Sequence, residues 1–365
     1  MKRLVRVAPL ATAALAVLVT ASCSSAATGG TGSRTPADTT RAISSAECAA
    51  NRAAGVIKFG SPFLYDASAG IIDVFAAIKL GYFRDLCLDV TFNPTPKDVY
   101  AEVSSGVYTV SGEGSAADDL VAVGHDSHFT AIATYGDTSD YAILTKTNVS
   151  SLRQLEGKTL GYHVVLPVAL QEMLTAAKVD VSKVKMVNDT SYDPTLLFHG
   201  PYQALQAYQS NEPFQLAAAH DPVTVWKPSQ FGVSGTFNVE IVNNAFLVAH
   251  SGAVKDFLRA ELHGFAYCAS HVSQCVGFEA TAAKAAGSYF DAATSAEEWR
   301  YEVALATDHT LPGKGVGVES TAEWTPELDA IVGDHLVSSP APVLSKVEDT
   351  ALAATLYRGK TLIWP

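Results

Sequence analysis

Hydrophobic positions follow two alternating periods along the first half of the chain. Short apolar runs with the period of a strand are each followed by a run with helical spacing. Residues 55–60, GVIKFG, predict a strand, and residues 70–83, GIIDVFAAIKLGYF, predict a helix that stops at Gly81. The same reasoning predicts strands over 86–94, 108–114 and 128–136, and helices over 99–105 and 115–124. Strands alternating with helices predict a parallel α/β sheet.

The alternation restarts near residue 150. The pattern predicts a short helix and a strand within 150–163, a helix over 166–179, a strand over 183–189, a helix over 200–210 and a strand over 214–220. Pro213 is interpreted as the stop after the helix over 200–210. Residues 237–251 predict a β-rich return, and the chain is mainly helical from Gly252. Two α/β units predict two lobes with a ligand in the crevice between them.

The N-terminus has the pattern of a secretion signal. Three basic residues precede the apolar run 7–21, which is too short for a comfortable membrane span. Small residues before Cys23 are typical of bacterial lipoproteins, in which the cysteine is lipidated. We therefore predict a signal peptide over 1–22 and a Ser/Thr/Gly-rich flexible tether over 23–47. An ordinary secreted protein, cut nearby, is the alternative.

Charge and length narrow the possible classes of protein. Without Lys2, Arg3 and Arg6, the 25 basic side chains become 22, against 37 acidic ones. The basic residues are isolated, and nucleic-acid binding needs clustered cations, so we expect no nucleic-acid partner. About 320 residues after the tether exceed one core of ordinary size, which again predicts two domains.

Four cysteines remain besides Cys23, and an even number in an oxidising compartment predicts two disulfides. Three pairings are possible, and we favour Cys48–Cys87 and Cys268–Cys275. The first would tie the start of the folded chain to the second strand, and the second would close a short loop at a helix end. Zinc is disfavoured because the chain has no CxxC and its ten histidines are scattered.

Four stretches, in order, resemble the NMT1/THI5-like and SsuA-type solute-binding proteins. They are AAIKLGYFRDLCLDVTF, SSLRQLEGKTLGY, ALQAYQSNEPFQLAAAHDPVTVWKPSQFGV and GAVKDFLRAELHGFAYCASH, within residues 55–290. Cys87 replaces a glycine that is usual in the first stretch. The third is closest to the subgroup that binds thiamine-pyrimidine precursors and riboflavin.

The resemblance implies a type 2 periplasmic-binding-protein fold, with two α/β lobes, a ligand cleft and a two-segment hinge. The expected lobes are 48–142 and 244–365 for the first and 143–243 for the second, with hinge segments near 140–146 and 240–247. The implied role is a monomeric receptor on the outer face of the bacterial cell membrane. It would be held there by lipid on Cys23, and would serve an ABC-importer permease. No cofactor is implied.

An enzyme branch of the family makes the thiamine pyrimidine from its own histidine and a pyridoxal cofactor. That branch needs a histidine after the first strand and a cysteine-rich iron motif. Residues 55–83 contain no histidine and the chain has no cysteine cluster, so we expect no enzyme activity.

Loops at the carboxyl ends of strands face the crevice in such a fold, and they supply the candidate binding residues. Phe63, Tyr65 and Asp66 follow the first strand, although both rings could simply pack under the helix. The turn GEGS offers Glu113 and Ser115, of which Ser115 could instead cap a helix and Glu113 could face solvent. The remaining candidates are Tyr135, Tyr162, Asn211 and Glu212. Asn211 could also serve as a cap, and Glu212 could bind a neighbouring backbone amide.

These candidates combine aromatic faces with carboxylates and amides. They fit a flat, neutral or weakly cationic heteroaromatic solute with N–H donors, such as a thiamine pyrimidine precursor or riboflavin. A sulfonate or nitrate would be repelled by Glu113, so an anion receptor is the second possibility. A lipoprotein scaffold without a ligand is the third.

Overall fold

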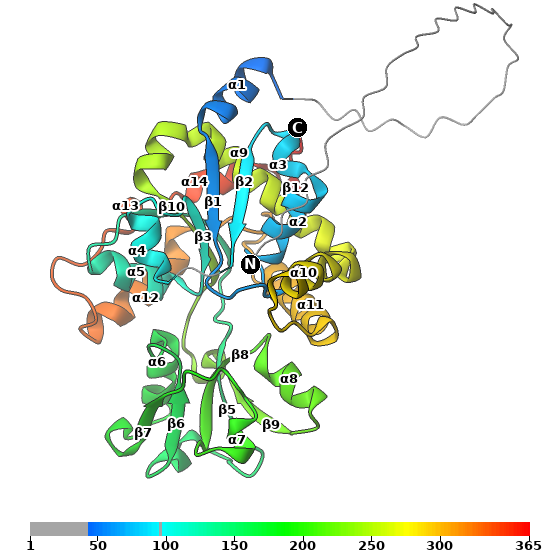
Figure 1. Cartoon of the computed structure of the whole chain (residues 1–365). Helices are drawn as coiled ribbons and strands as arrows, with labels where there is room; N and C mark the ends of the chain where they lie inside the picture. The colour runs from blue at the N-terminus through cyan, green and yellow to red at the C-terminus, as the bar shows by residue number, and fades with distance from the viewer. Residues whose placement is uncertain (1–42, 95–96) are drawn as a thin grey trace, which may run out of the picture. The chain divides into compact units, whose positions relative to one another are not determined.

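The computed structural model describes residues 43–94 and 97–365, and contains two five-stranded sheets (Figure 1). We call each sheet with its covering helices a lobe. The predicted signal peptide, Cys23 and most of the predicted tether lie outside the described residues. No helix in the described part of the chain combines the length and apolar character that a membrane span requires.

The first lobe contains a mixed sheet with the order β2-β1-β3-β10-β4. Strand β1 pairs in parallel with β2 and β3, whereas β10 is antiparallel to both β3 and β4. The strands are β1 Val56–Gly60, β2 Asp89–Asn93, β3 Val110–Glu113, β4 Phe129–Gly136 and β10 Phe237–Asn243. The predicted strands of the first half are therefore all present, and β10 makes the sheet mixed rather than wholly parallel.

The second lobe contains a sheet with the order β7-β6-β8-β5-β9. Strand β6 is parallel to β7 and β8, and β5 is antiparallel to β8 and β9. The strands are β5 Tyr141–Lys146, β6 Thr159–Tyr162, β7 Lys185–Asn188, β8 Ala204–Tyr208 and β9 Val223–Trp226. Strand β5 follows the segment that crosses from the first sheet to the second. Strand β10 follows the segment that crosses back.

These sheets correct the predicted lobe boundaries. The chain leaves the first sheet after Gly136 and enters the second at Tyr141, close to the predicted boundary at 142/143. It returns between Trp226 and Phe237, because β10 pairs with β3 and β4. The predicted boundary at 243/244 therefore falls one strand too late, and residues 240–247 lie in the first lobe instead of in a crossing segment.

The helix and strand predicted around Pro213 are exchanged. Residues 204–208 form β8, and residues Glu212–Ala218 form helix α8. Ala and Leu in β8 favour helices in isolation, but β8 pairs with β5 and β6, and this sheet context overrides that preference. Pro213 occupies the first turn of α8, where its missing N–H has no helical partner, so it begins a helix rather than ending one.

Helices cover both sheets. In the first lobe these are α1 Ser45–Ala53, α2 Ile72–Leu80, α3 Tyr82–Asp85, α4 Val99–Ser104, α5 Ala116–Gly124, α9 Asn244–Ser270, α10 Val272–Ala286, α11 Ala292–Asp308, α12 Thr321–Gly333, α13 Leu344–Val347 and α14 Thr350–Ala354. In the second they are α6 Val168–Ala176, α7 Leu196–His199 and α8, with 3₁₀ turns at Leu152–Leu155, Val181–Lys183 and Pro228–Phe231. A small hairpin, β11 Tyr357–Arg358 and β12 Thr361–Leu362, lies near the C-terminus.

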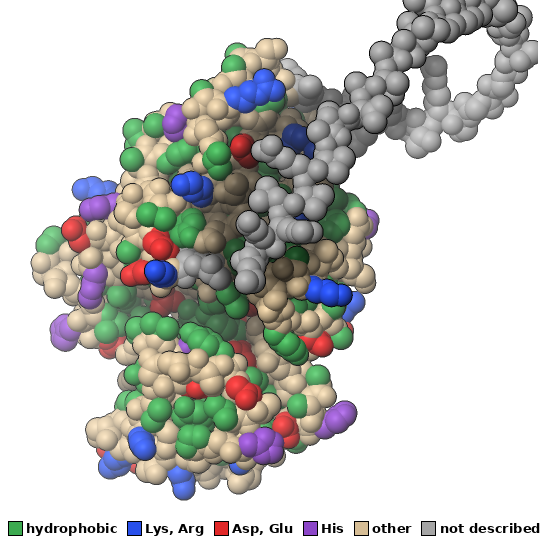
Figure 2. Space-filling view, viewed as in Figure 1, with side chains coloured by type: hydrophobic (Ala, Val, Ile, Leu, Met, Phe, Trp, Pro, Cys, Tyr) green, Lys and Arg blue, Asp and Glu red, His purple; other side chains and the backbone are tan. Residues whose placement is uncertain are grey.

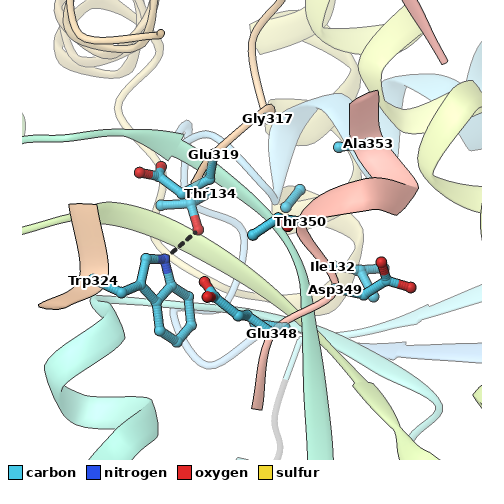
Figure 3. Close-up of a pocket in the computed structure, with 11 residues that line it drawn as sticks. Ile132, Thr134, Gly317, Glu319, Trp324, Glu348, Asp349, Thr350 and Ala353 are labelled. Atoms are coloured by element: carbon cyan, nitrogen blue, oxygen red, sulfur yellow. Dashed lines mark hydrogen bonds between the residues drawn. The ribbon is translucent and has the colours of Figure 1, made fainter. Parts of the chain in front are cut away.

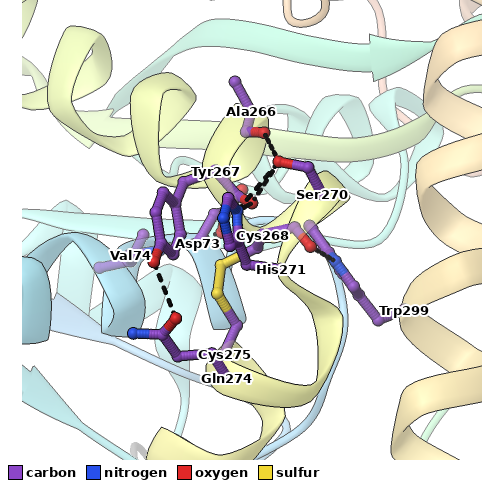
Figure 4. Close-up of a disulfide and its surroundings, with 10 residues drawn as sticks. All are labelled: Asp73, Val74, Ala266, Tyr267, Cys268, Ser270, His271, Gln274, Cys275 and Trp299. Carbon is purple, nitrogen blue, oxygen red and sulfur yellow. Dashed lines mark hydrogen bonds between the residues drawn. A yellow bond between two sulfur atoms is a disulfide. The ribbon is translucent and has the colours of Figure 1, made fainter.

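Both favoured disulfides are confirmed, Cys48–Cys87 and Cys268–Cys275. Figure 4 shows the second, which joins the end of α9 to the first turn of α10 beside Trp299. The Trp299 indole donates a hydrogen bond of 2.9 Å to the Cys268 carbonyl. Helix α1 begins at Ser45, inside the range assigned to the tether, because Ser44 caps it and Cys48 fixes it to Cys87.

Candidate functional site

A cavity of about 40 Å³ lies where segments of both lobes meet. Asp140 belongs to the segment that leaves the first lobe, and Asn238 belongs to β10, the strand on which the chain returns. The lining residues are Phe63, Gly114, Asp140, Tyr141, Tyr208, Phe237, Asn238 and Glu302. This volume suits one or two water molecules, so a larger ligand would require the lobes to open.

Aromatic rings from the two lobes meet at this cavity. Phe63, in the loop after β1, contacts Tyr208 at the end of β8 edge-on, with ring centroids 5.6 Å apart. Tyr208 also lies 5.1 Å from the ring of Tyr141. The Tyr141 hydroxyl donates to Asp118 Oδ2 at 2.8 Å, which holds that ring in place. The rings provide an apolar surface of the kind that packs against a flat solute.

Asp140 supplies a carboxylate to the same cavity. Its Oδ2 accepts a hydrogen bond of 2.6 Å from Ser210 Oγ, whereas its Oδ1 has no partner in the described part of the chain. The side chain is only 5% exposed. Burial raises the pKa of Asp140 to about 7, against the lowering effect of the Ser210 hydrogen bonds.

Helix α11 brings two more carboxyls to this region, Glu298 and Glu302. They lie one turn apart on the buried face of the helix. Glu302 accepts a hydrogen bond from the backbone N–H of Ala69, and burial raises its pKa well above the usual range. Burial does the same for Glu298, which shares a hydrogen bond with Asp66. Two carboxyls can share a hydrogen bond only when one of them carries a proton, so this pair shares a proton.

Polar contacts connect the lobes around the cavity. Asn211 Nδ2 lies 3.4 Å from Asp66 Oδ2. The Tyr301 hydroxyl on α11 donates to Gln209 Oε1 at 2.8 Å, and accepts from Lys227 Nζ at 3.0 Å. The cavity lining itself contains no lysine, arginine or histidine among the described residues. On the face drawn in Figure 2, lysine and arginine side chains are scattered and form no basic patch.

Three of the predicted site residues lie at or beside the cavity. Phe63 lines it, Asp66 contacts Glu298, and Asn211 contacts Asp66 across the lobes. Glu212 is nearby, since the charges of Asp66 and Asp140 contribute to raising its pKa to about 7, although burial is the largest cause. Its Oε2 accepts the Tyr208 backbone N–H at 2.7 Å, and it lines a separate small hollow with Leu144.

The other predicted residues lie elsewhere. Tyr65 packs on Phe75 and Phe92, with ring centroids 6.0 and 5.9 Å away, so it belongs to the core under the helix. Tyr135 is fully buried in the first lobe, where its hydroxyl lies 3.0 Å from Asp73 Oδ2.

Ser115 caps α5, as one of its two interpretations predicted. Glu113 is the last residue of β3 and pairs with Val239. Tyr162 lines a groove of about 520 Å³ beside α6, together with Val164 and Val165.

Sequence reasoning missed Asp140, Asn238, Glu298 and Glu302. Asp140 and Asn238 reach the cavity because the two segments that cross between the lobes bring them there. The sequence pattern does not predict the course of these segments. The two glutamates did leave a signal, because the buried positions 295, 298, 302 and 306 of α11 follow helical spacing and two of them are acidic. Charged residues on the buried stripe of a helix indicate a polar interior or a site.

A hollow in the first lobe is too small to compete as a site. It lies between β4 and the segment before α14, and encloses about 10 Å³, room for one water molecule at most. Figure 3 shows Glu319 and Glu348 beside Trp324, whose indole donates to Thr134 Oγ1 at 3.3 Å. Burial raises the pKa of Glu319 to about 10, so that carboxyl remains neutral at pH 7.

The sequence matches the profile of a known family, described as NMT1/THI5 like, over residues 68–274, more than half of the chain. The chain belongs to the NMT1/THI5-like family. This confirms the resemblance drawn from the four sequence stretches. No curated protein matches the chain in sequence.

Solved structures show the fold of this family member. The periplasmic aliphatic sulphonate-binding protein SsuA from Escherichia coli aligns with a TM-score of 0.60 at 13% identity, covering 85% of this chain and 96% of that one. The alkanesulfonate-binding protein SsuA from Xanthomonas axonopodis pv. citri, bound to MOPS, aligns with a TM-score of 0.60 at 12% identity, covering 80% and 98%. The desulfurization enzyme DSZB aligns with a TM-score of 0.55 at 10% identity, covering 82% and 98%. The predicted periplasmic-binding-protein fold is therefore confirmed, and the fold is shared by binding proteins and by an enzyme.

Proposed function

We propose that this NMT1/THI5-like protein is the solute receptor of an ABC importer. It binds a small, flat organic molecule between its lobes, with aromatic rings on the ligand's faces and carboxyls on its N–H donors. The observation that carries the proposal is the interlobe cavity, whose lining combines Phe63 and Tyr208 with Asp140 and Glu302. Binding there would hold the two lobes together, as in a hinge-closing receptor.

A thiamine pyrimidine precursor fits this lining better than an anion does. An aminopyrimidine offers N–H donors to carboxylates in charge-assisted hydrogen bonds, and its ring can lie against tyrosine or phenylalanine. Riboflavin offers a larger ring with a single ring N–H donor, so it is the second heteroaromatic candidate. The cavity, at about 40 Å³, must expand for either.

A sulfonate-type anion is the alternative, because two of the structures similar to this chain are named as sulfonate-binding proteins. Against it, the cavity lining has two carboxyls and, in the part described, no cationic side chain. At a pH where these carboxyls are ionised, a sulfonate within about 4 Å of one of them would be repelled by about 4 kcal/mol at an effective dielectric constant of 20.

The proposal is tested by thermal-shift measurements on the full chain. The panel is 4-amino-5-hydroxymethyl-2-methylpyrimidine, the same ring with an aminomethyl group, riboflavin, alkanesulfonates and nitrate. A true ligand at one hundred times its Kd stabilises the folded state by about 2.7 kcal/mol. We expect an aminopyrimidine to raise Tm. A shift with sulfonates alone would favour the alternative, and no shift with any solute would favour a scaffold without a ligand.

We propose that the receptor is a monomer, lipid-anchored at Cys23 on the outer face of the membrane, and that it delivers its solute to an ABC-importer permease. Replacing Cys23 with Ser should abolish the incorporation of radiolabelled palmitate that the wild type shows. A wild type that incorporates no label would contradict the lipid anchor.

A further inference from the structure

Two buried polar groups at the interlobe cavity have no protein partner. Asp140 Oδ1 and Asn238 Nδ2 form no hydrogen bond with any described residue, and their side chains are 5% and 8% exposed. Unpaired buried polar groups cost free energy, so such groups at a cavity indicate a partner that the protein itself does not supply.

Asn238 has a second unusual property. Its φ of 45° lies in the left-handed region, although it is a non-glycine residue inside strand β10. Such backbone strain persists where the surrounding structure requires it, and it concentrates at ligand sites. In this protein the strained residue is Asn238, which lines the cavity beside Phe237.

The groups around Asp140 are mostly acidic. Burial raises the pKa of Asp140, Ser210 and Lys227 oppose that rise, and Asp66 adds to it. The charge of Asp140 acts in turn on Tyr208, Glu212, Tyr301 and Glu302. With Glu298, five carboxyls from both lobes therefore interact with one another near the cavity, which Asp140 and Glu302 line, and Lys227 places an ammonium group beside them. Lys227 is already hydrogen-bonded to Tyr301. The cluster is thus one in which an added positive charge would be favoured.

The carboxyls differ in the hydrogen bonds that their oxygens accept. Glu302 accepts the Ala69 N–H, and Asp66 accepts hydrogen bonds from the Ala67 N–H and from Asn211 Nδ2. Asp140 has Ser210 on one oxygen and nothing on the other. A positively charged hydrogen-bond donor would therefore gain the most free energy at the unpaired oxygen of Asp140. Glu302 lines the same cavity.

Resting on the proposed solute-binding function, we propose that the ligand binds as an organic cation. Its protonated amine, amidine or guanidine group lies between Asp140 and Glu302, and its ring or apolar body lies against Tyr208 and Phe63. Thus the carboxyls select the ligand's charge and the rings select its shape.

Proton release accompanies this binding. Burial raises the pKa of Asp140 to about 7 and the pKa of Glu302 well above its usual range, so ionisation of these carboxyls is disfavoured at the lower end of the pH range in the free protein. When the cation enters, a carboxylic acid O–H bond breaks, the carboxylate pairs with the cation, and the proton passes to the buffer. Affinity for a cation therefore rises with pH from 5 to 8, whereas an anionic ligand would show the opposite trend.

Three probes with one ring separate charge from shape. Benzamidine, benzamide and benzenesulfonate carry a positive, zero and negative charge on the same benzene ring. Isothermal titration of the full chain at pH 5 and pH 8, at each pH in two buffers that hold that pH and differ in ionisation enthalpy, gives both the Kd and the number of protons released. We expect benzamidine to bind at least tenfold more tightly than benzamide at pH 8, with proton release, and benzenesulfonate not to bind.

Substitutions of single carboxyls test where the cation binds. Asp140→Asn should remove the preference for benzamidine over benzamide, and Glu302→Gln should reduce it, with folding checked by circular dichroism. Glu297→Gln is the matched control, since Glu297 is an exposed carboxylate on the same helix, paired with Arg300. Equal losses in Glu297→Gln and Asp140→Asn would overturn the placement of the cation.

The outcomes distinguish this inference from the function on which it rests. If benzenesulfonate, riboflavin or another uncharged or anionic solute binds and no cation does, the inference fails and the receptor stands. If neither these probes nor any solute of the thermal-shift panel binds, both fail. Binding of benzamidine that is equally tight at pH 5 and pH 8 would also contradict the carboxyl exchange.

Discussion

Single residues in this chain often have two interpretations, and Glu212 shows how the structure combines them. Its carboxylate accepts the Tyr208 backbone N–H at 2.7 Å and also feels the charges of Asp66 and Asp140. The first role needs an oxygen acceptor, and only the second needs a charge. The two roles can therefore be separated by substitution.

We expect Glu212→Gln to keep the hydrogen bond and leave stability almost unchanged at pH 6. At pH 8 it should be slightly more stable than the wild type, because a half-buried charge near other carboxylates is removed. Glu212→Ala should lose about 1 kcal/mol or more at both values, since the Tyr208 N–H loses its acceptor. Urea unfolding at the two pH values measures this. An Ala variant as stable as the Gln variant would show that the bond is unimportant.

Gly264 in α9 gives a prediction about packing. A Cβ at Gly264 would lie 2.4 Å from the Asp73 carbonyl oxygen on α2, whereas a Cβ at Gly252 in the same helix would meet nothing within 4 Å. Gly264→Ala should therefore cost about 1–3 kcal/mol, by forcing the two helices apart. Gly252→Ala should gain up to about 1 kcal/mol from helix propensity. The denaturant midpoints of unfolding compare the stability of the two variants. Similar midpoint shifts for Gly264→Ala and Gly252→Ala would refute the close contact at Gly264.

At the scale of elements, periodicity predicted the first lobe well and the second less well. Strands β1 to β4 are bounded by Gly and polar residues, and they follow one another in order along the sequence. The exchange of β8 and α8 has a physical cause: the stretch ALQAY contains good helix formers, and only its position between β5 and β6 makes it a strand. Likewise, Asp140 and Glu302 were missed because they meet only through long-range packing.

Helix α1 provides a test of how one element is attached. Asn51 is its only buried residue, donating to Leu86 O and Asp256 Oδ2 at 2.8 Å each, and Cys48 binds it covalently to Cys87. The disulfide encloses a sequence separation of 39, for which loop entropy gives about 4 kcal/mol.

Replacing both Cys48 and Cys87 with Ala should therefore lower global stability by up to that amount. It should also speed hydrogen exchange in α1 at least tenfold, and by a larger factor than in the core amides of α9. Asn51→Ala in the wild-type background is the companion variant, which keeps the covalent link and removes the hydrogen bonds. Unchanged protection of α1 in the double alanine variant would show that Asn51 alone holds the helix.

At the scale of the whole molecule, buried carboxyls make stability depend on pH. Burial raises the pKa of Asp73, Asp140 and Glu327 to about 7, from ordinary values near 4. Between about pH 4 and pH 7 the folded state therefore binds more protons than the unfolded state. Stability is highest below the unfolded pKa values and falls as pH rises through the folded ones. Across this window each such carboxyl lowers the free energy of unfolding by about 1.4 kcal/mol for every increase of one in pH.

We expect Tm to be higher at pH 5 than at pH 8, measured by calorimetry without ligand. Glu327→Gln should flatten this slope and raise Tm at pH 8, because the amide keeps an oxygen acceptor for the Ala117 N–H, which Glu327 Oε2 accepts at 3.0 Å, and never ionises. Glu297→Gln removes an exposed charge and should leave the slope unchanged. A protein that is more stable at pH 8 than at pH 5 would mean that these carboxyls are ionised in the fold. Asp140, which lines the cavity, would then carry a permanent negative charge instead of an exchangeable proton.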